Sequence, residues 1–239
     1  MARDAAATAQ QAPPPRPGAS GADLCPPAIR QHALSSSDPV PLLRPAGAAA
    51  APRGEDYRHH LATTAHGWPR LQRWCVWIEP PGRDPAARLW EERWQQAVQQ
   101  ALEQWQQPVA LTLVEDPAQA QVRLWRRRPP RLPGPDGRLR ASHGRAILRL
   151  LQVERAGFLR LEPAVEVLIS PAQRQDGIAA TALHELGHAF GLWGHSDDPA
   201  DAMAAVPGAQ PVLQLSRRDR ATLLWLQSQP TTIGSPLPP

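Results

Sequence analysis

The chain has 239 residues, of which 42% are hydrophobic, and a formal net charge of +4; it contains 29 prolines and two cysteines. This composition suffices for one folded domain with tails, and no run of about 18 apolar residues is present that would span a membrane. The N-terminus shows no secretory h-region either, so the sequence alone leaves the compartment unknown.

The two ends of the chain differ in composition from its middle. Residues 1–58 are rich in proline and alanine and have no apolar periodicity, which predicts a disordered tail. We expect one folded domain over 59–230 and a second disordered tail over 231–239. The two cysteines, Cys25 in the first tail and Cys75 in an expected strand, do not indicate a disulfide framework.

Apolar patterns predict the elements of the domain in the order strand, long helix, several strands, helix, loop, helix. Asp84 and Pro85 are typical of a helix start, and apolar residues then recur every three or four positions up to about 107. A second helix is expected from about 175–178 through 184–191. A third follows Ser216, with Asp219 three residues later in a near capping-box arrangement. Five strands are expected at 73–80, 109–116, 120–125, 145–153 and 164–170, so the fold class is α+β.

The stretch HELGHAFGLWGH, residues 184–195, holds the side chains that indicate chemistry. On a helix, His184 and His188 lie about 40° apart around the axis and about 6 Å apart along it, so both imidazoles can bind one zinc ion. Glu185 lies on the adjoining face, where it can touch a water held by the metal. His195 reaches the same ion only if the helix ends, and Gly191 is placed for the left-handed residue that would turn the chain back.

These residues match the H-E-x-x-H-x-x-G-x-x-H signature of the metzincin clan of zinc endopeptidases, and Ser196 after the third histidine resembles the matrixin family. Met203 lies eight residues after His195, the spacing of the matrixin Met-turn. Asp219 resembles an acidic residue that matrixins keep in their last helix.

The resemblance implies a zincin-like fold: a twisted mixed five-stranded sheet with two long helices, then a Met-turn and a C-terminal helix. It also implies one catalytic Zn²⁺ on His184, His188 and His195, with Glu185 as the general base of peptide-bond hydrolysis. The expected partner is a protein or peptide substrate, and a monomer is the default. Secretion is suggested only by the habit of the family.

In the family, substrate lies antiparallel to an edge strand just before the active-site helix, and residues 145–153 are the candidate here. Arg145 and Arg149 would then face substrate side chains, which leads to the hypothesis that acidic residues flank the cleaved bond. Binding by three neutral imidazoles further predicts that metal affinity falls below about pH 6.

The sequence departs from the matrixin pattern in several places. The residues after Met203 lack the tyrosine and nearby proline of the S1′ wall, so specificity is not transferable. The clusters that hold structural zinc and calcium are absent, and His143 is read as a surface residue. The residues around Cys25 share little with the propeptide motif of matrixins, so a cysteine switch is not expected.

Arginines concentrate between 121 and 160, most densely in WRRRPPR at 125–131. No nucleic-acid-binding module accompanies them, so a solvated basic face is expected rather than a nucleic-acid partner. The alternative function is a catalytically weak metzincin-fold binding module acting through this surface and the proline-rich tail. A purely structural zinc is a third possibility. The intact Glu185 counts against both, because neither needs a base.

Overall fold

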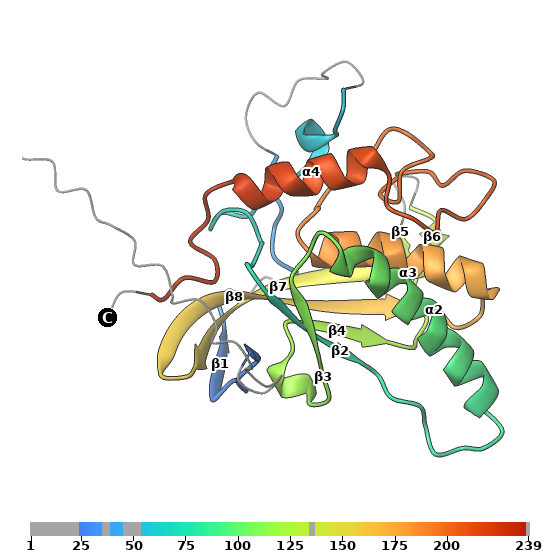
Figure 1. Cartoon of the computed structure of the whole chain (residues 1–239), viewed down its shortest axis with the longest axis horizontal. Coiled ribbons are helices and arrows are strands. Elements are labelled where there is room, and N and C mark those ends of the chain that lie inside the picture. Colours follow the sequence, from blue (N-terminus) through green and yellow to red (C-terminus); the bar gives the residue numbers. More distant parts are fainter. Residues whose placement is uncertain (1–23, 35–38, 45–53, 134–136, 238–239) are drawn as a thin grey trace, which may run out of the picture.

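The computed structural model describes residues 24–34, 39–44, 54–133 and 137–237 (Figure 1). Its helices are α2 (Arg88–Gln106), α3 (Gln175–Ala189) and α4 (Arg217–Ser228), with short 3-10 turns at Arg58–His60 and Pro117–Gln119. Its strands are β1 (Arg30–Ala33), β2 (Trp74–Ile78), β3 (Leu111–Val114), β4 (Val122–Trp125), β5 (Leu132–Pro133), β6 (Leu139–Arg140), β7 (Gly144–Arg155) and β8 (Phe158–Ile169).

One mixed sheet of six strands, in the order β1-β7-β8-β4-β2-β3, forms the centre of the fold. The strands β3, β2, β4 and β8 are parallel, whereas β7 is antiparallel to β8 and β1 is antiparallel to β7. The predicted α+β class is confirmed. The predicted number of five strands is wrong, because β1 from the N-terminal segment adds a sixth.

The inner strands form from runs of large apolar residues. In β2, the sequence WCVWI is buried from Trp74 to Trp77. A parallel strand covered on both faces needs such a continuous apolar run rather than an alternating one. Strand β2 lies in the interior of the sheet, with a parallel neighbour on each side, and its apolar run matches this position.

Helix α2 packs its apolar stripe against the sheet and α3, and Figure 1 shows α2 and α3 on the same side of the sheet. Two buried tryptophans fix this packing, since the Trp94 indole donates to the Ile169 carbonyl at 3.2 Å and the Trp105 indole to the Leu183 carbonyl at 3.0 Å. The helix begins at Arg88, later than predicted, because the Asp84 carbonyl accepts from the Ala87 N–H in a preceding turn.

The described parts of the N-terminal segment, predicted to be disordered, are built into the fold. Strand β1 pairs with β7, and Tyr57 is fully buried. The segment lacks periodicity because it adds as an edge strand and as single anchors, which need no repeating pattern. The C-terminal segment also packs: Ile233 is buried, and the Gly234 N–H donates to the Leu161 carbonyl at 2.7 Å.

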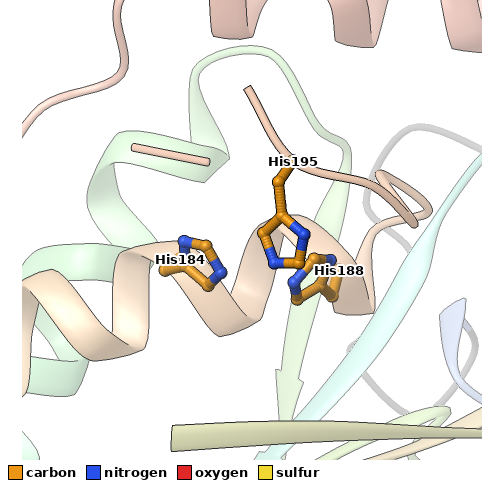
Figure 2. Close-up of side chains that lie close together, drawn as sticks. All are labelled: His184, His188 and His195. Carbon is orange, nitrogen blue, oxygen red and sulfur yellow. The ribbon is translucent and has the colours of Figure 1, made fainter. Parts of the chain in front are cut away.

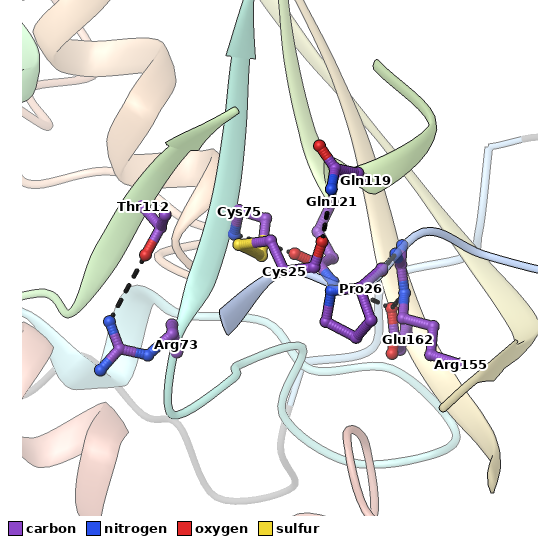
Figure 3. Close-up of a disulfide and its surroundings, with 9 residues drawn as sticks. All are labelled: Cys25, Pro26, Arg73, Cys75, Thr112, Gln119, Gln121, Arg155 and Glu162. Carbon is purple, nitrogen blue, oxygen red and sulfur yellow. Dashed lines mark hydrogen bonds and ion pairs between the residues drawn. A yellow bond between two sulfur atoms is a disulfide. The ribbon is translucent and has the colours of Figure 1, made fainter. Parts of the chain in front are cut away.

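A disulfide joins Cys25 to Cys75, which corrects the expectation that the two cysteines do not form a disulfide framework (Figure 3). They are 50 residues apart in sequence, and both side chains are buried. Closing a loop of this length removes conformational freedom from the unfolded chain, which contributes about 4 kcal/mol to stability in the chain-entropy description. Because its sulfur is bonded to Cys75, Cys25 is not free to act as a metal-blocking thiolate.

Within the described residues, no helix has both the length and the apolar character needed to cross a bilayer.

Candidate metal centre

Helix α3 presents two of the three histidines that converge in Figure 2. The His184 Nδ1 lies 2.8 Å from the Ala202 carbonyl, and the His188 Nδ1 lies 2.7 Å from the Leu192 carbonyl. A carbonyl only accepts hydrogen bonds, so each Nδ1 carries the proton and each Nε2 keeps its lone pair. Backbone carbonyls are common partners for the second nitrogen of a metal-binding histidine.

The chain turns back at Gly191, as the sequence predicts. Gly191 has φ +109°, a left-handed conformation, and a Cβ there would lie 2.9 Å from the Leu226 side chain and 3.0 Å from the Pro69 carbonyl oxygen. Both the conformation and the lack of space therefore require glycine. The turn brings the His195 ring to 5.3 Å from the His184 ring and 4.9 Å from the His188 ring, measured between centroids.

The three histidines fit a metal ion. Their candidate ligand atoms all lie within 4.8 Å of one another. Three nitrogens on a tetrahedral Zn²⁺, each at about 2.0–2.1 Å from the ion, are about 3.4 Å apart, so the rings need only a small inward movement. Among the described residues, this is the one cluster of histidine, cysteine and acidic side chains with such spacing; His59, His60, His66 and His143 are outside it.

The pKa values of all three imidazoles are lowered, which favours the neutral form. It lowers the pKa of His184 to about 4, partly opposed by the Ala202 carbonyl. Burial, with the neighbouring His184 and His195, holds the pKa of His188 well below its usual range. The pKa of His195 is also lowered by desolvation, although this side chain is exposed. The free histidines are thus in the state that binds a metal.

Glu185 follows His184 on α3 and is buried against the start of β7. Burial raises the pKa of Glu185 to about 7, while the Ala146 N–H and the Arg145 charge favour the ionised form. A Cβ at Gly144 would lie 2.6 Å from both Cγ and Oε1 of Glu185. The strand therefore fits closely against this carboxyl group, and glycine at 144 makes that approach possible.

The loop after His195 is held by backbone hydrogen bonds and packs against α3. The Ser196 N–H donates to the Met203 carbonyl at 2.7 Å, and the Ala205 N–H returns to the Ser196 carbonyl at 3.0 Å. The Met203 side chain is fully buried against Gly187 on α3. Ser196 is buried too, and its hydroxyl donates to Asp201 and accepts from Arg218. Met203 thus packs against the helix that carries His184 and His188, and Ser196 holds the loop that follows His195.

Asp219 ties this loop to α4. It is fully buried and accepts from the Ala202 N–H at 2.9 Å, from the Ser216 N–H at 2.9 Å and from the Tyr57 hydroxyl at 2.8 Å. The Ser216 hydroxyl accepts from the Asp219 N–H, which completes the capping box that the sequence indicated. Through Ala202, whose carbonyl orients His184, Asp219 is connected to the group of three histidines.

The sequence did not point to four residues that shape this site. Tyr57 lies in the segment expected to be disordered, although it is the single tyrosine of the chain. Gly144 adjoins Glu185, and a Cβ at Gly194 would lie 2.2 Å from the His60 carbonyl oxygen. Arg218 donates to Ser196, Asp197 and Asp201. Gly194, the second glycine of GLWGH, was a visible signal in the sequence. The roles of the other three residues depend on long-range contacts.

Replacing Gly187 with alanine is expected to lower the free energy of unfolding by about 1–3 kcal/mol, because the new Cβ would lie 2.1 Å from Met203 Sδ. Gly177→Ala on the same helix is the matched control, since its Cβ would meet only Gln173 at 3.4 Å or more. Urea unfolding of both variants tests the contact. Equal stability of the two variants would contradict the close packing of Met203 under α3.

A cavity of about 340 Å³ lies away from the histidines, beside the disulfide. Its lining includes Arg70, Arg160 and the buried Arg155–Glu162 pair. None of the three histidines lines it, so this cavity is separate from the group of three histidines.

No protein-family model matches the sequence, and no curated protein matches it. The assignment of a function to this site therefore depends on its own geometry and on the motif.

Proposed function

We propose that the protein is a metzincin-like zinc endopeptidase of the matrixin type, with His184, His188 and His195 holding Zn²⁺ and Glu185 acting as the general base. The observation that carries the proposal is the convergence of three neutral imidazoles beside a buried carboxyl group with a pKa of about 7. A zinc ion with three protein ligands keeps a position open for water or substrate, lowers the pKa of the water and polarises the substrate carbonyl.

The pKa of Glu185, about 7, suits the role of general base in this reaction. A general base is most effective when its pKa is near the working pH, because it then both accepts and releases a proton readily. Its carboxylate takes the proton of the attacking water and delivers it to the nitrogen of the leaving amine. The Ala146 N–H, which hydrogen-bonds to the carboxyl group, holds it beside the strand where substrate would lie.

The position of β7 supports a peptide as the substrate. Its first residues, 144–146, pass beside Glu185, and these residues pair with β8 on their other side. An extended peptide can add to a strand edge through main-chain hydrogen bonds, which bind many sequences. The proposed substrate strand runs antiparallel to β7, with the bond to be cleaved near Ala146.

The buried Glu185 favours an enzyme over the binding module. Keeping a carboxyl group in this position costs stability, because a pKa shift of one unit corresponds to about 1.4 kcal/mol. A site that only holds a metal, or a surface that only binds a partner, gains nothing from this cost. The Cys25–Cys75 disulfide further suggests an oxidising compartment, where such bonds persist.

The test is metal analysis of the purified protein beside casein cleavage, before and after chelation and after Zn²⁺ is restored. We expect one bound zinc ion per chain and cleavage that disappears and returns with the metal. Bound zinc without cleavage of casein or of a mixed peptide library by the same preparation would instead support the binding module.

The pH dependence of zinc binding follows from the lowered histidine pKa values. Protons compete with the metal only when the imidazoles become charged, and His184 resists this down to about pH 4. We expect zinc affinity to begin to fall below pH 6.5, where the exposed His195 becomes charged first, and to fall further around pH 4, where His184 becomes charged as well. Competition titration with a chromophoric chelator measures this, and a fall centred near pH 6.5 with no further fall around pH 4 would contradict the burial of the ligands.

A further inference from the structure

The N-terminal segment covers most of the free edge of β7. In β1, Arg30, Gln31, His32 and Ala33 pair with Glu154, Val153, Gln152 and Leu151. The chain then continues along the same edge, since the Leu34 N–H donates to the Leu150 carbonyl and the Val40 N–H to the Leu148 carbonyl, both at 3.1 Å. The segment therefore runs antiparallel to β7 and toward the end that lies beside Glu185.

The alternation of residues along β7 determines which of its main-chain groups the N-terminal segment leaves unpaired. The carbonyls of Leu148 and Leu150 point outward to the N-terminal segment. In an antiparallel ladder, every second residue bonds to the same neighbour, so Gly144 and Ala146 are the remaining outward-facing positions. Among the described residues, no main chain pairs with those two on this edge. The open part of the edge is thus the short part beside Glu185, where the Ala146 N–H donates to the Glu185 carboxyl group and the Ala146 carbonyl and the Gly144 main chain remain for a substrate.

Both ends of the covering segment are anchored. Figure 3 shows the first anchor, where the Cys25–Cys75 disulfide is joined by a hydrogen bond from Gln119 Nε2 to the Cys25 carbonyl at 2.9 Å. At the other end, Leu43 and Thr63 exchange two backbone hydrogen bonds of 2.7 and 2.8 Å. The Ala62 N–H then donates to the Trp193 carbonyl at 2.6 Å, two residues before His195. The cover is therefore fixed to β2 and to the loop of the third histidine.

We infer that the N-terminal segment, residues 24–34 and 39–44, is a specificity element that limits how many substrate residues can precede the cleaved bond. This rests on the proposed function. A substrate antiparallel to β7 has its N-terminal side opposite Leu148 and beyond, where the chain's own main chain already lies. From Ala146 to Leu148 is about 7 Å, so one or two substrate residues fit before the two main chains meet.

The consequence is a preference for bonds near the N-terminus of a peptide. Residues on the C-terminal side of the cleaved bond extend past Gly144, where none of the described residues of the N-terminal segment pairs with β7. A long peptide is cut well only near its N-terminus. With an open edge, four or more residues before the cleaved bond would form additional main-chain hydrogen bonds and raise kcat/KM.

The experiment uses a peptide that the zinc-loaded full-length protein cuts, found by mass spectrometry of a casein digest, and a nested set of it with one to six residues before the cleaved bond. We expect kcat/KM to level off or fall beyond two residues. In Leu34→Pro, which lacks the N–H that bonds to Leu150, the peptides with four or more residues should gain about tenfold, the equivalent of one or two restored hydrogen bonds.

Ala33→Pro is the matched control, because alternation turns the Ala33 N–H away from β7, so proline there removes no ladder bond. Should Leu34→Pro not fold, the Cys25→Ser, Cys75→Ser pair releases the first anchor instead. Hydrogen exchange gives a readout besides activity: the amides of His32, Leu34 and Val40 are expected to be protected in the wild type and to lose protection in the released variants, with zinc content unchanged.

The outcomes are distinct. A wild-type kcat/KM that rises steadily up to six residues, or released variants that behave like wild type on long peptides despite lost protection, would overturn the inference while leaving the protease intact. Cleavage of no peptide by any zinc-loaded form would overturn the proposed function and this inference with it.

Discussion

Replacing Glu185 with glutamine is expected to lower kcat/KM for peptide hydrolysis by at least about a thousandfold while leaving one zinc ion per chain. Glutamine has nearly the same shape, so the three histidines keep their places, but its amide neither takes nor returns a proton. Loss of a positioned general base costs about 10²–10⁴ in rate, and here the same group serves both proton transfers. Rates on the best casein-derived peptide and metal analysis measure the two effects.

The same substitution is also expected to increase stability at high pH. Replacing a residue that mainly supports the fold would instead decrease stability. The folded pKa of Glu185, about 7, is above its ordinary value of 4.5. Its contribution to stability is therefore greatest below pH 4.5 and is lost as the pH rises to 7 and above. In the metal-free protein at pH 8, Glu185→Gln should be more stable than wild type by up to about 3 kcal/mol, and the gain should shrink toward pH 4.5.

Urea unfolding of the metal-free wild type and variant across this pH range checks the second effect. A variant that is inactive and also less stable at pH 8 would show that Glu185 mainly supports the fold. Glu92→Gln is a suitable control, because Glu92 is an exposed helix residue paired with Arg88, and surface pairs of this kind contribute at most about 1 kcal/mol.

Removing the Asp219 carboxylate is the second large change. Asp219→Ala leaves the Tyr57 hydroxyl and the N–H groups of Ala202 and Ser216 without their acceptor in a fully buried position. Breaking a buried charged network in this way costs about 3–5 kcal/mol. Because the Ala202 carbonyl orients His184, zinc affinity should fall as well.

Two variants separate the parts of this effect. Tyr57→Phe removes one donor and is expected to cost about 1–2 kcal/mol with little change in zinc affinity, because the bonds to Ala202 and Ser216 remain. Asp176→Ala removes an acidic residue from the first turn of α3, where it is exposed, and should cost less than about 1 kcal/mol. If Asp219→Ala lowered the free energy of unfolding by no more than Asp176→Ala does, that result would contradict the buried hydrogen-bond network.

Local patterns predicted much of the fold. The five expected strands all occur, and α2, α3 and α4 lie where the apolar periodicity indicated. Gly191 turns the chain as predicted, because a left-handed position has a strong local preference for glycine. The convergence of His184, His188 and His195 follows from helix geometry and this turn. Such features depend on neighbours within about a dozen residues.

Contacts between distant segments were not predictable. Strand β1 was missed because an edge strand of four exposed residues carries no alternating pattern. The disulfide was missed because pairing depends on where Cys25 lies once β1 has added to β7. Tyr57 was missed because its partners, Asp219 and Thr222, are more than 160 residues away. Each belongs to a segment whose composition alone suggested disorder.

The Cys25–Cys75 bond also changes what a single cut of the backbone does to this molecule. Cleavage of any peptide bond between the two cysteines opens a covalent ring, but the two fragments remain one molecule until the bond is reduced. A nicked protein would therefore keep its mass on a non-reducing gel and separate into two bands with a reductant. The N-terminal piece would stay beside the sheet at a high effective concentration, as a tethered subunit rather than a released peptide.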